Sequence, residues 1–326
     1  MLALEAGASD GSSLPSGYWR GELQAFEYML DASPLVVERL REHTFHITGL
    51  KTYDYRKPTA EARRRFAEKL DALVALDGAE LLVPESRELG GFGYELDGAL
   101  YNLDTLKFFE CLIALQRSGV LSALRERPSV VWEIGAGWGG FAYQFKTLCP
   151  DATYLIVDFP ELFLFSAVYL MTLFPGARVR FWEGEADLFS SLEDVDFVFI
   201  PAAALGSMRP PRLDLTINMV SFQEMTTAQV DAYVERAHEL NCPYLYSLNR
   251  DRSPHNDELT SVRERIARRF WLHTIPMLDV PYLRPLERPP FDGKLGRGVQ
   301  VIRKRLRGGP FAEDYEHLIG WRREEI

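Results

Sequence analysis

Two patterns of apolar positions divide the chain near residue 128. Before that point, apolar residues recur at three- and four-residue spacing, which is typical of amphipathic helices. Beyond it, short runs rich in β-branched and aromatic residues alternate with helical segments. The chain is therefore predicted to have a helical N-terminal region, residues 1–127, followed by an α/β region, residues 128–326. Loops of the N-terminal region, such as residues 44–56, could form a lid or one wall of a pocket.

The α/β region is predicted to form a mostly parallel sheet that is covered by helices on both faces, because strands and helices alternate along it. The predicted strands are residues 130–134, 153–157, 196–201, 214–220, 244–248, 271–275 and 298–303. The predicted helices are residues 21–29, 34–43, 59–76 and 103–118 before the sheet, and 141–148, 160–174, 227–240 and 257–269 within it.

Three segments leave the order of the sheet partly open. Residues 178–182 are an alternative to 196–201 as the third strand. The proline-rich stretch 281–290 leaves too little chain for a crossover helix, so we expect the last two strands to be antiparallel. Residues 311–326 are predicted to be a terminal helix or a tail, and residues 1–17 a loose tail without a secretory signal.

Composition narrows the class of protein further. Of the 326 residues 47% are hydrophobic, enough for a large core, and the longest apolar run, 162–174, is shorter than the roughly 20 residues that cross a bilayer. A net charge of −10 argues against a nucleic-acid surface and favours cationic ligands. Three scattered cysteines indicate neither a disulfide framework nor a zinc site. We therefore expect a cytoplasmic protein without a nucleic-acid or membrane partner.

A glycine-rich turn follows the first predicted strand. Gly135, Gly137 and Gly140 have the G-x-G-x-x-G spacing of a dinucleotide site, between a buried strand and a helix. In a sheet of this kind, the first strand-to-helix turn lies at the carboxyl edge where ligands bind. The pattern alone is compatible with a nicotinamide cofactor and with S-adenosylmethionine.

Two acidic residues distinguish between these cofactors. Asp158 ends the second strand, where a carboxylate can accept both ribose hydroxyls of an adenosine, or cap the helix that Pro160 begins. Glu133 lies just before the first glycine, where it would be unfavourable beside a pyrophosphate and favourable beside a sulfonium and an ammonium group. The alternative for Glu133 is an ion pair with a neighbouring basic residue. Asp158 suits the adenosine of either cofactor, and Glu133 favours S-adenosylmethionine.

Three segments together resemble a known family. They are Glu133-Ile-Gly-Ala-Gly-Trp-Gly-Gly140, Tyr154-Leu-Ile-Val-Asp-Phe-Pro-Glu161, and Asp214-Leu-Thr-Ile-Asn218 with Ser221-Phe-Gln-Glu-Met225. They resemble the sugar O-methyltransferases of natural-product pathways, which are class I S-adenosylmethionine-dependent methyltransferases. The chain is also similar to an aminoglycoside N-methyltransferase of gentamicin biosynthesis. The resemblance covers residues 101–250 and implies a seven-stranded, Rossmann-like, mostly parallel sheet.

The resemblance also implies the roles of individual residues. Glu133, Gly135, Gly137 and Trp138 would surround the methionine part of the cofactor, with Asp158 at the ribose and Phe159 beside the adenine. Pro201 and Ala202 would lie at the adenine edge, and Asn218, Ser221 and Gln223 on the methionine side. Tyr55, Tyr101, Asp104 and Asn249 are candidates for contacts with the acceptor.

Two residues are candidates for the base that removes the acceptor proton. Glu224 follows the fourth strand, although an acidic residue before the helix 227–240 would also complement the helix dipole. His255 lies in a loop after the fifth strand, where a surface role is the alternative. Related enzymes hold magnesium with an adjacent acidic pair, which this sequence lacks after its fourth and fifth strands, so we predict no essential metal.

The sequence thus predicts an enzyme that moves a methyl group from S-adenosylmethionine to a hydroxyl or amino group on a sugar of a natural product, with S-adenosylhomocysteine as the other product. An aminoglycoside amine is a serious candidate, given the acidic chain. The alternatives are an NAD(P)-dependent oxidoreductase and a non-catalytic S-adenosylmethionine-binding protein. A homo-oligomer is compatible with the sequence.

Overall fold

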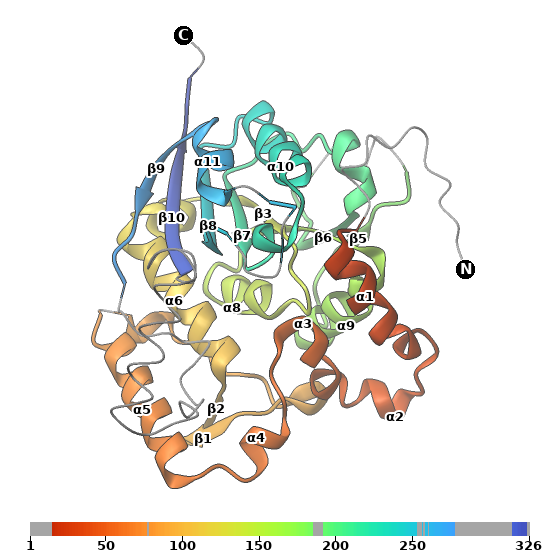
Figure 1. Cartoon of the computed structure of the whole chain (residues 1–326), viewed down its shortest axis with the longest axis vertical. Helices are drawn as coiled ribbons and strands as arrows, with labels where there is room; N and C mark the ends of the chain where they lie inside the picture. Colours follow the sequence, from red (N-terminus) through yellow and green to blue (C-terminus); the bar gives the residue numbers. More distant parts are fainter. Residues whose placement is uncertain are drawn as a thin grey trace.

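A computed structural model gives the fold of the chain. It describes residues 15–76, 78–184, 192–252, 256, 258–259, 261–277 and 315–324. The molecule combines a large mixed sheet with a group of short N-terminal helices (Figure 1). This arrangement is the α/β class that the alternation of strands and helices predicts.

The large sheet has the strand order β5-β6-β4-β3-β7-β8-β10-β9. Its strands are β3 (Val130–Ile134), β4 (Thr153–Asp158), β5 (Val179–Phe181), β6 (Phe197–Pro201), β7 (Leu215–Met219), β8 (Tyr244–Arg250), β9 (Phe270–Thr274) and β10 (Tyr315–Arg322). The pairs from β5 to β8 are parallel, whereas β10 is antiparallel to both β8 and β9. The carboxyl ends of the parallel strands therefore share one edge.

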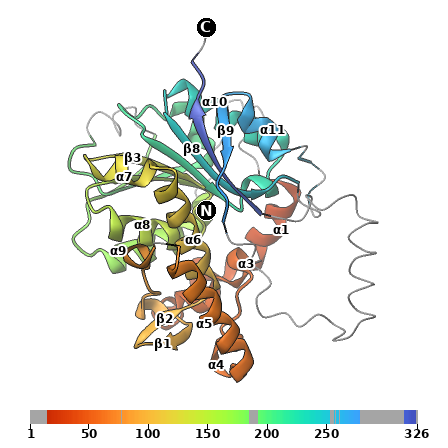
Figure 2. The same cartoon turned by 90° about the vertical axis from the view of Figure 1, so that its left-hand side faces the viewer.

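The two faces of the sheet belong to separate hydrophobic clusters. Successive residues of a strand point to opposite faces, and accordingly Val131 and Tyr154 belong to one cluster while Trp132 and Leu155 belong to the other. Helices α6 (Leu103–Arg117), α8 (Gly140–Leu148) and α9 (Phe163–Leu173) cover the first face. Helices α10 (Thr227–Glu239) and α11 (Val262–Ala267) cover the second (Figure 2). Both faces are buried, as a parallel sheet requires.

The N-terminal helices extend the first of these clusters. Phe26 and Phe66 lie in the same core as Phe165 of α9, and the rings of Phe26 and Phe165 meet edge to face at 5.4 Å. The helices of this region are α1 (Gly17–Ala25), α2 (Pro34–Val37), α3 (Phe45–Thr48), α4 (Tyr53–Arg56), α5 (Ala60–Val74) and α7 (Val120–Arg125), with a hairpin of β1 (Tyr94–Leu96) and β2 (Ala99–Tyr101). Trp19 of α1 also belongs to this core and Ile47 of α3 packs against it, so shared packing holds α1 and α3 beside the sheet.

Short 3-10 helices connect these elements. They are η1 (Glu27–Asp31), η2 (Leu40–His43), η3 (Ala79–Leu81), η4 (Glu88–Gly90), η5 (Pro160–Leu162), η7 (Ala202–Ser207) and η8 (Phe222–Glu224). Three of them, η5, η7 and η8, follow sheet strands directly or within a few residues and so lie at the carboxyl edge. Of these, η8 brings the polar residues Gln223 and Glu224 to the place where ligands bind in open α/β sheets.

Several predicted elements differ from the structure. Residues 178–182 and 196–201 both contain strands, so the main sheet has eight described strands and not seven. The prediction of a helix or tail over residues 311–326 was wrong, because β10 inserts there between β8 and β9 and pairs with both. The predicted helix 34–43 is interrupted at residues 38–39. The predicted strand 298–303 lies outside the described residues.

Candidate cofactor and acceptor site

The turn after β3 has a backbone that only glycine adopts readily. Gly135 and Gly137 have φ angles of +73° and +60°, in the left-handed region. A Cβ atom at Gly135 would lie 2.4 Å from Ser221 Oγ, and one at Gly137 would lie 2.7 Å from a methyl carbon of Ile47. The glycines therefore allow other parts of the protein, as well as a ligand, to approach the turn.

A cavity of about 520 Å³ opens at this turn. Its wall comes from the carboxyl ends of β3, β4, β7 and β8 and from helices α1, α3 and α6. Of the residues predicted from the sequence, the structure places these on the wall: Glu133, Gly135, Gly137, Trp138, Asp158, Phe159, Ala202, Ser221, Gln223 and Glu224. Residues that are distant in the sequence thus share one concave surface of a size suited to a small molecule.

Glu133 is a buried carboxyl group on the wall beside the glycine turn. Tyr154, on the adjacent strand β4, donates a hydrogen bond of 2.9 Å to Glu133 Oε2. Burial raises the pKa of Glu133 to about 8, and the Tyr154 hydrogen bond and the nearby Lys107 ammonium act in the opposite direction. A cationic ligand group beside Glu133 would stabilise its carboxylate form.

Asp158 connects the glycine turn to the end of β4. Its Oδ2 accepts a hydrogen bond of 2.8 Å from the backbone N–H of Gly137, and its Oδ1 accepts one of 2.9 Å from Phe159. Burial raises the pKa of Asp158 to about 7 against these two bonds. The N-cap position of η5 is Phe159, without a side-chain cap, so the capping role considered for Asp158 does not occur there.

Glu224 lies in η8 on another part of the cavity wall. The indole of Trp19, from α1, donates a hydrogen bond to the Glu224 side chain. Burial raises the pKa of Glu224 to about 8, so both its protonated and its ionised form are accessible near neutral pH. Its position and its pKa suit a group that exchanges a proton with a ligand.

A second polar pair reaches the cavity from the N-terminal helices. His46 Nδ1 of α3 lies 3.1 Å from Glu22 Oε2 of α1, and both residues line the cavity. The sequence indicated only that the loop 44–56 could form a lid. Trp19, Lys107, Arg250 and Tyr315 also line the cavity and were not predicted as site residues. A lysine in the apolar helix 103–118 was a signal that could have been used.

Two predicted residues lie behind the wall. Asn218 donates to Ile134 O at 2.9 Å and accepts from the Asn249 side chain at 2.9 Å and from the backbone N–H of Phe222. These bonds connect the ends of β3, β7 and β8. Asn218 and Asn249 therefore hold the edge of the site in place and do not line the cavity.

The other predicted residues have different positions. Tyr55 is buried, and its hydroxyl accepts from the backbone N–H of Leu103, while Asp104 is buried beside Arg41. Tyr101 lies in β2 and Pro201 at the end of β6, and neither lines the cavity. His255 lies outside the described residues. The functional roles assigned to all these residues stay predictions.

Among the described residues, no three His, Cys, Asp or Glu side chains gather closely enough to hold a metal ion. No described helix has the length and apolar character to cross a membrane.

Comparisons with known proteins give structural similarity without sequence similarity. No protein-family model matches the sequence, and no curated protein matches it either. Among solved structures, the pyocyanin biosynthetic protein PhzM matches 65% of this chain with 11% identity and a TM-score of 0.37. The match spans 57% of the length of that protein.

Two further structures are similar to the same extent. Precorrin-6y C5,15-methyltransferase from Geobacter metallireducens shares 11% identity over 63% of this chain and 88% of its own, with a TM-score of 0.36. Phosphoethanolamine N-methyltransferase 2 of Haemonchus contortus, in complex with S-adenosyl-L-methionine, shares 13% identity over 69% of this chain and 58% of its own, with a TM-score of 0.38. Any assignment of activity therefore depends on the residues of the site.

Proposed function

We propose that the protein is an S-adenosylmethionine-dependent methyltransferase that acts on a hydroxyl or amino group of a sugar-bearing small molecule. The observation that carries the proposal is the placement of Glu133 and Asp158, at the ends of adjacent strands, beside the glycine turn on the wall of one cavity. The bound cofactor would supply a methyl group on a cationic sulfur.

The residues at the glycine turn fit this cofactor better than a dinucleotide. In its carboxylate form, Glu133 would attract a sulfonium or an ammonium and would repel a pyrophosphate. Asp158 can accept hydrogen bonds from ribose hydroxyls through lone pairs that its two backbone donors leave open. Phe159 offers an aromatic ring on the same wall.

The other part of the wall fits a hydrogen-bonding acceptor. Trp19, Glu22, His46 and Glu224 come from α1, α3 and η8 and combine aromatic surface with proton-accepting groups. Glu224 would accept the proton of an acceptor hydroxyl, and the His46–Glu22 pair is a second group that can do so. Two carboxyl groups in this part also favour a cationic aminosugar, for which we keep the amine as a candidate acceptor.

Methyl transfer to defined acceptors tests the proposal. The protein is incubated with isotopically labelled S-adenosylmethionine and a panel of neutral glycosides and aminoglycosides, and products are identified by mass spectrometry. We expect a labelled methyl group on at least one member of the panel, and methylation of neutral glycosides alone would exclude the amine. Cofactor binding without transfer to any acceptor would instead support a non-catalytic binding protein.

A further inference from the structure

Lys107, in the second turn of helix α6, places a cation on the cavity wall. Its neighbours Leu106 and Phe108 are buried in the hydrophobic core, and the Lys107 side chain is only 13% exposed. Retaining an ammonium at such a position is unfavourable unless it is paired or binds a ligand.

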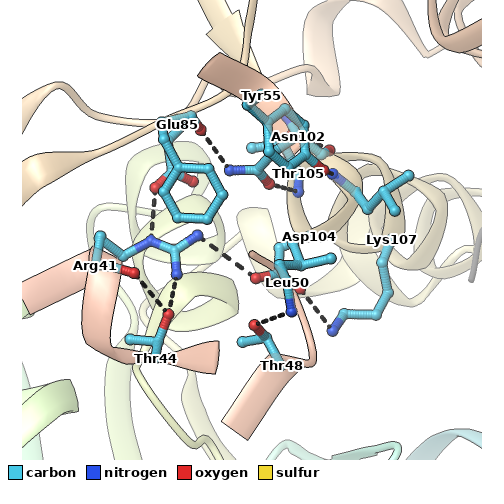
Figure 3. Close-up of polar contacts among 12 residues, drawn as sticks. Arg41, Thr44, Thr48, Leu50, Tyr55, Glu85, Asn102, Asp104, Thr105 and Lys107 are labelled. Carbon is cyan, nitrogen blue, oxygen red and sulfur yellow. Dashed lines mark hydrogen bonds and ion pairs between the residues drawn. The ribbon is translucent and has the colours of Figure 1, made fainter. Parts of the chain in front are cut away.

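A buried ionic network holds Lys107 in place (Figure 3). Its ammonium donates to Asp104 Oδ1 at 3.1 Å, and the other oxygen of Asp104 lies 3.5 Å from Arg41 Nη2. Arg41 is itself bound to Glu85, with Nε 2.6 Å from Oε1. The four charges balance, so the network can be buried without a net charge.

The same network contacts the glycine turn. The Arg41 guanidinium lies over the ring of Trp138, 3.4 Å from its centroid, and Trp138 lies on the cavity wall between Gly137 and Gly140. A guanidinium stacked on an indole favours a fixed orientation of both groups. Contacts through Asp104 and Arg41 thus link the Lys107 side chain to Trp138 of the glycine turn and fix its position.

Lys107 has hydrogen-bonding capacity that these contacts do not use. A lysine ammonium has three donors, and among the described residues it donates one hydrogen bond, to Asp104. Lys107 and Glu133 line the same cavity, and the Lys107 ammonium acts on the pKa of both Glu133 and Glu224. The cavity wall therefore presents a cation and, at the glycine turn, a carboxyl group, which matches the carboxylate and ammonium of an α-amino acid.

We propose that Lys107 binds the α-carboxylate of the methionine part of the cofactor while Glu133 faces its α-ammonium, with Asp104 and Arg41 as positioning residues. This inference rests on the proposed function and adds a residue that discriminates among adenosyl ligands. It assigns Lys107 to the cofactor and not to a carboxylate of the acceptor.

Two ligands that differ only in the carboxylate test the proposal. Binding of S-adenosylmethionine and of decarboxylated S-adenosylmethionine is measured by calorimetry at one pH, without acceptor. We expect the native protein to prefer S-adenosylmethionine, and Lys107→Met to lower that affinity roughly 10- to 100-fold, the range for a hydrogen bond to a charged group. Affinity of Lys107→Met for the decarboxylated ligand should change far less.

Two further variants control the experiment. Lys107→Arg keeps the charge and should retain most of the preference, whereas Lys57→Met changes an exposed lysine outside the cavity wall and should have no effect. Thermal unfolding shows whether each variant is folded. If Lys107→Met does not fold, the preference of the native protein and of Lys107→Arg still decides.

The outcomes separate this inference from the proposed function. Equal affinity of the native protein for the two ligands, or an equal loss for both in Lys107→Met, would overturn the role of Lys107 while leaving the cofactor assignment intact. Failure of the native protein to bind either ligand would overturn the proposed function and this inference with it.

Discussion

The two parts of the cavity wall are built in different ways. Beside the glycine turn, the wall is built mainly of backbone and side chains at the ends of the adjacent strands β3 and β4, which the hydrogen bonds of Asp158 join, with Lys107 of α6 added to it. The other part consists of side chains from α1, α3 and η8, which tertiary packing brings together. Strand pairing sets the first part, whereas the packing of short helices sets the second.

This difference suggests a division of function. A wall built on paired strands suits a ligand that is the same in every turnover, because its geometry is fixed by the hydrogen bonds of the sheet. A wall built from short helices suits the variable partner, since α1 and α3 can be altered without breaking strand pairing. We therefore expect substitutions in the strand-built part to weaken cofactor binding, and substitutions in the helix-built part to change the reaction with the acceptor.

Replacing Glu224 should produce the largest effect. If Glu224 removes the proton of a hydroxyl acceptor, Glu224→Gln should lower kcat about 10²- to 10⁴-fold, the usual contribution of a general base. The affinity for S-adenosylhomocysteine should change little, and the increase of rate with pH through about 8 should disappear. Steady-state kinetics across pH, with Glu239→Gln as a variant outside the cavity wall, measures this. An unchanged kcat would remove Glu224 from the chemistry.

A methyl group at Gly135 should disturb the strand-built part most. Left-handed backbone costs a non-glycine residue about 1–2 kcal/mol, and the contact with Ser221 Oγ adds about 1–3 kcal/mol. Gly135→Ala should therefore lower the free energy of unfolding by about 2–5 kcal/mol in urea titrations. Gly176→Ala, where a Cβ has no neighbour within 4 Å, should have little effect. Equal stability of the two variants would contradict this view of the turn.

The sequence predicted the strand-built part because its residues are contiguous. Gly135, Gly137 and Glu133 belong to one strand and turn, and Asp158 ends the next strand, so local pattern and strand adjacency bring them together. The parallel α/β fold was predicted for the same reason. Strand β10 was missed because its pairing with β8 depends on a long-range contact that no local pattern indicates.

The other part could be predicted only in fragments. Glu224 follows a strand and was predicted, but Trp19 and His46 reach the cavity through the packing of α1 and α3, which have no strand to define their position. Tyr55 and Asp104 were predicted to contact the acceptor, yet they lie in α4 and α6, where a hydrogen bond with Leu103 and an ion pair with Arg41 hold them off the cavity wall. Tertiary contacts, and not residue type, decide which loop residues face a ligand.

Asp158 gives a smaller test of the comparison. The Asp158 carboxylate accepts hydrogen bonds from the backbone N–H groups of Gly137 and Phe159. In Asp158→Asn, the amide nitrogen would replace one accepting oxygen, and one of these two N–H groups would lose its acceptor. Calorimetry should show S-adenosylhomocysteine binding weakened roughly 10- to 100-fold. Asp151→Asn, at an exposed position, is the matched control. The account of the turn is wrong if the two variants bind alike.

The smallest effect expected is a dependence of cofactor binding on pH. Glu133 has a pKa of about 8, so its carboxylate becomes protonated as the pH falls through that value. Protonation removes the negative charge that attracts a cationic ligand. Affinity for S-adenosylmethionine should therefore fall between pH 8.5 and 7, by at most about tenfold per pH unit. Glu133→Gln should flatten this dependence in calorimetric titrations. A native affinity that rises as pH falls would have the opposite sign.

The most direct test of the central claim is a thermal unfolding measurement with S-adenosylhomocysteine and with NAD⁺. A ligand that binds only the folded protein stabilises it by about 2.7 kcal/mol at a concentration of 100 Kd. The proposed site predicts a higher unfolding temperature with S-adenosylhomocysteine and no change with NAD⁺. Stabilisation by NAD⁺ and not by S-adenosylhomocysteine would contradict it and would assign the glycine turn to a dinucleotide.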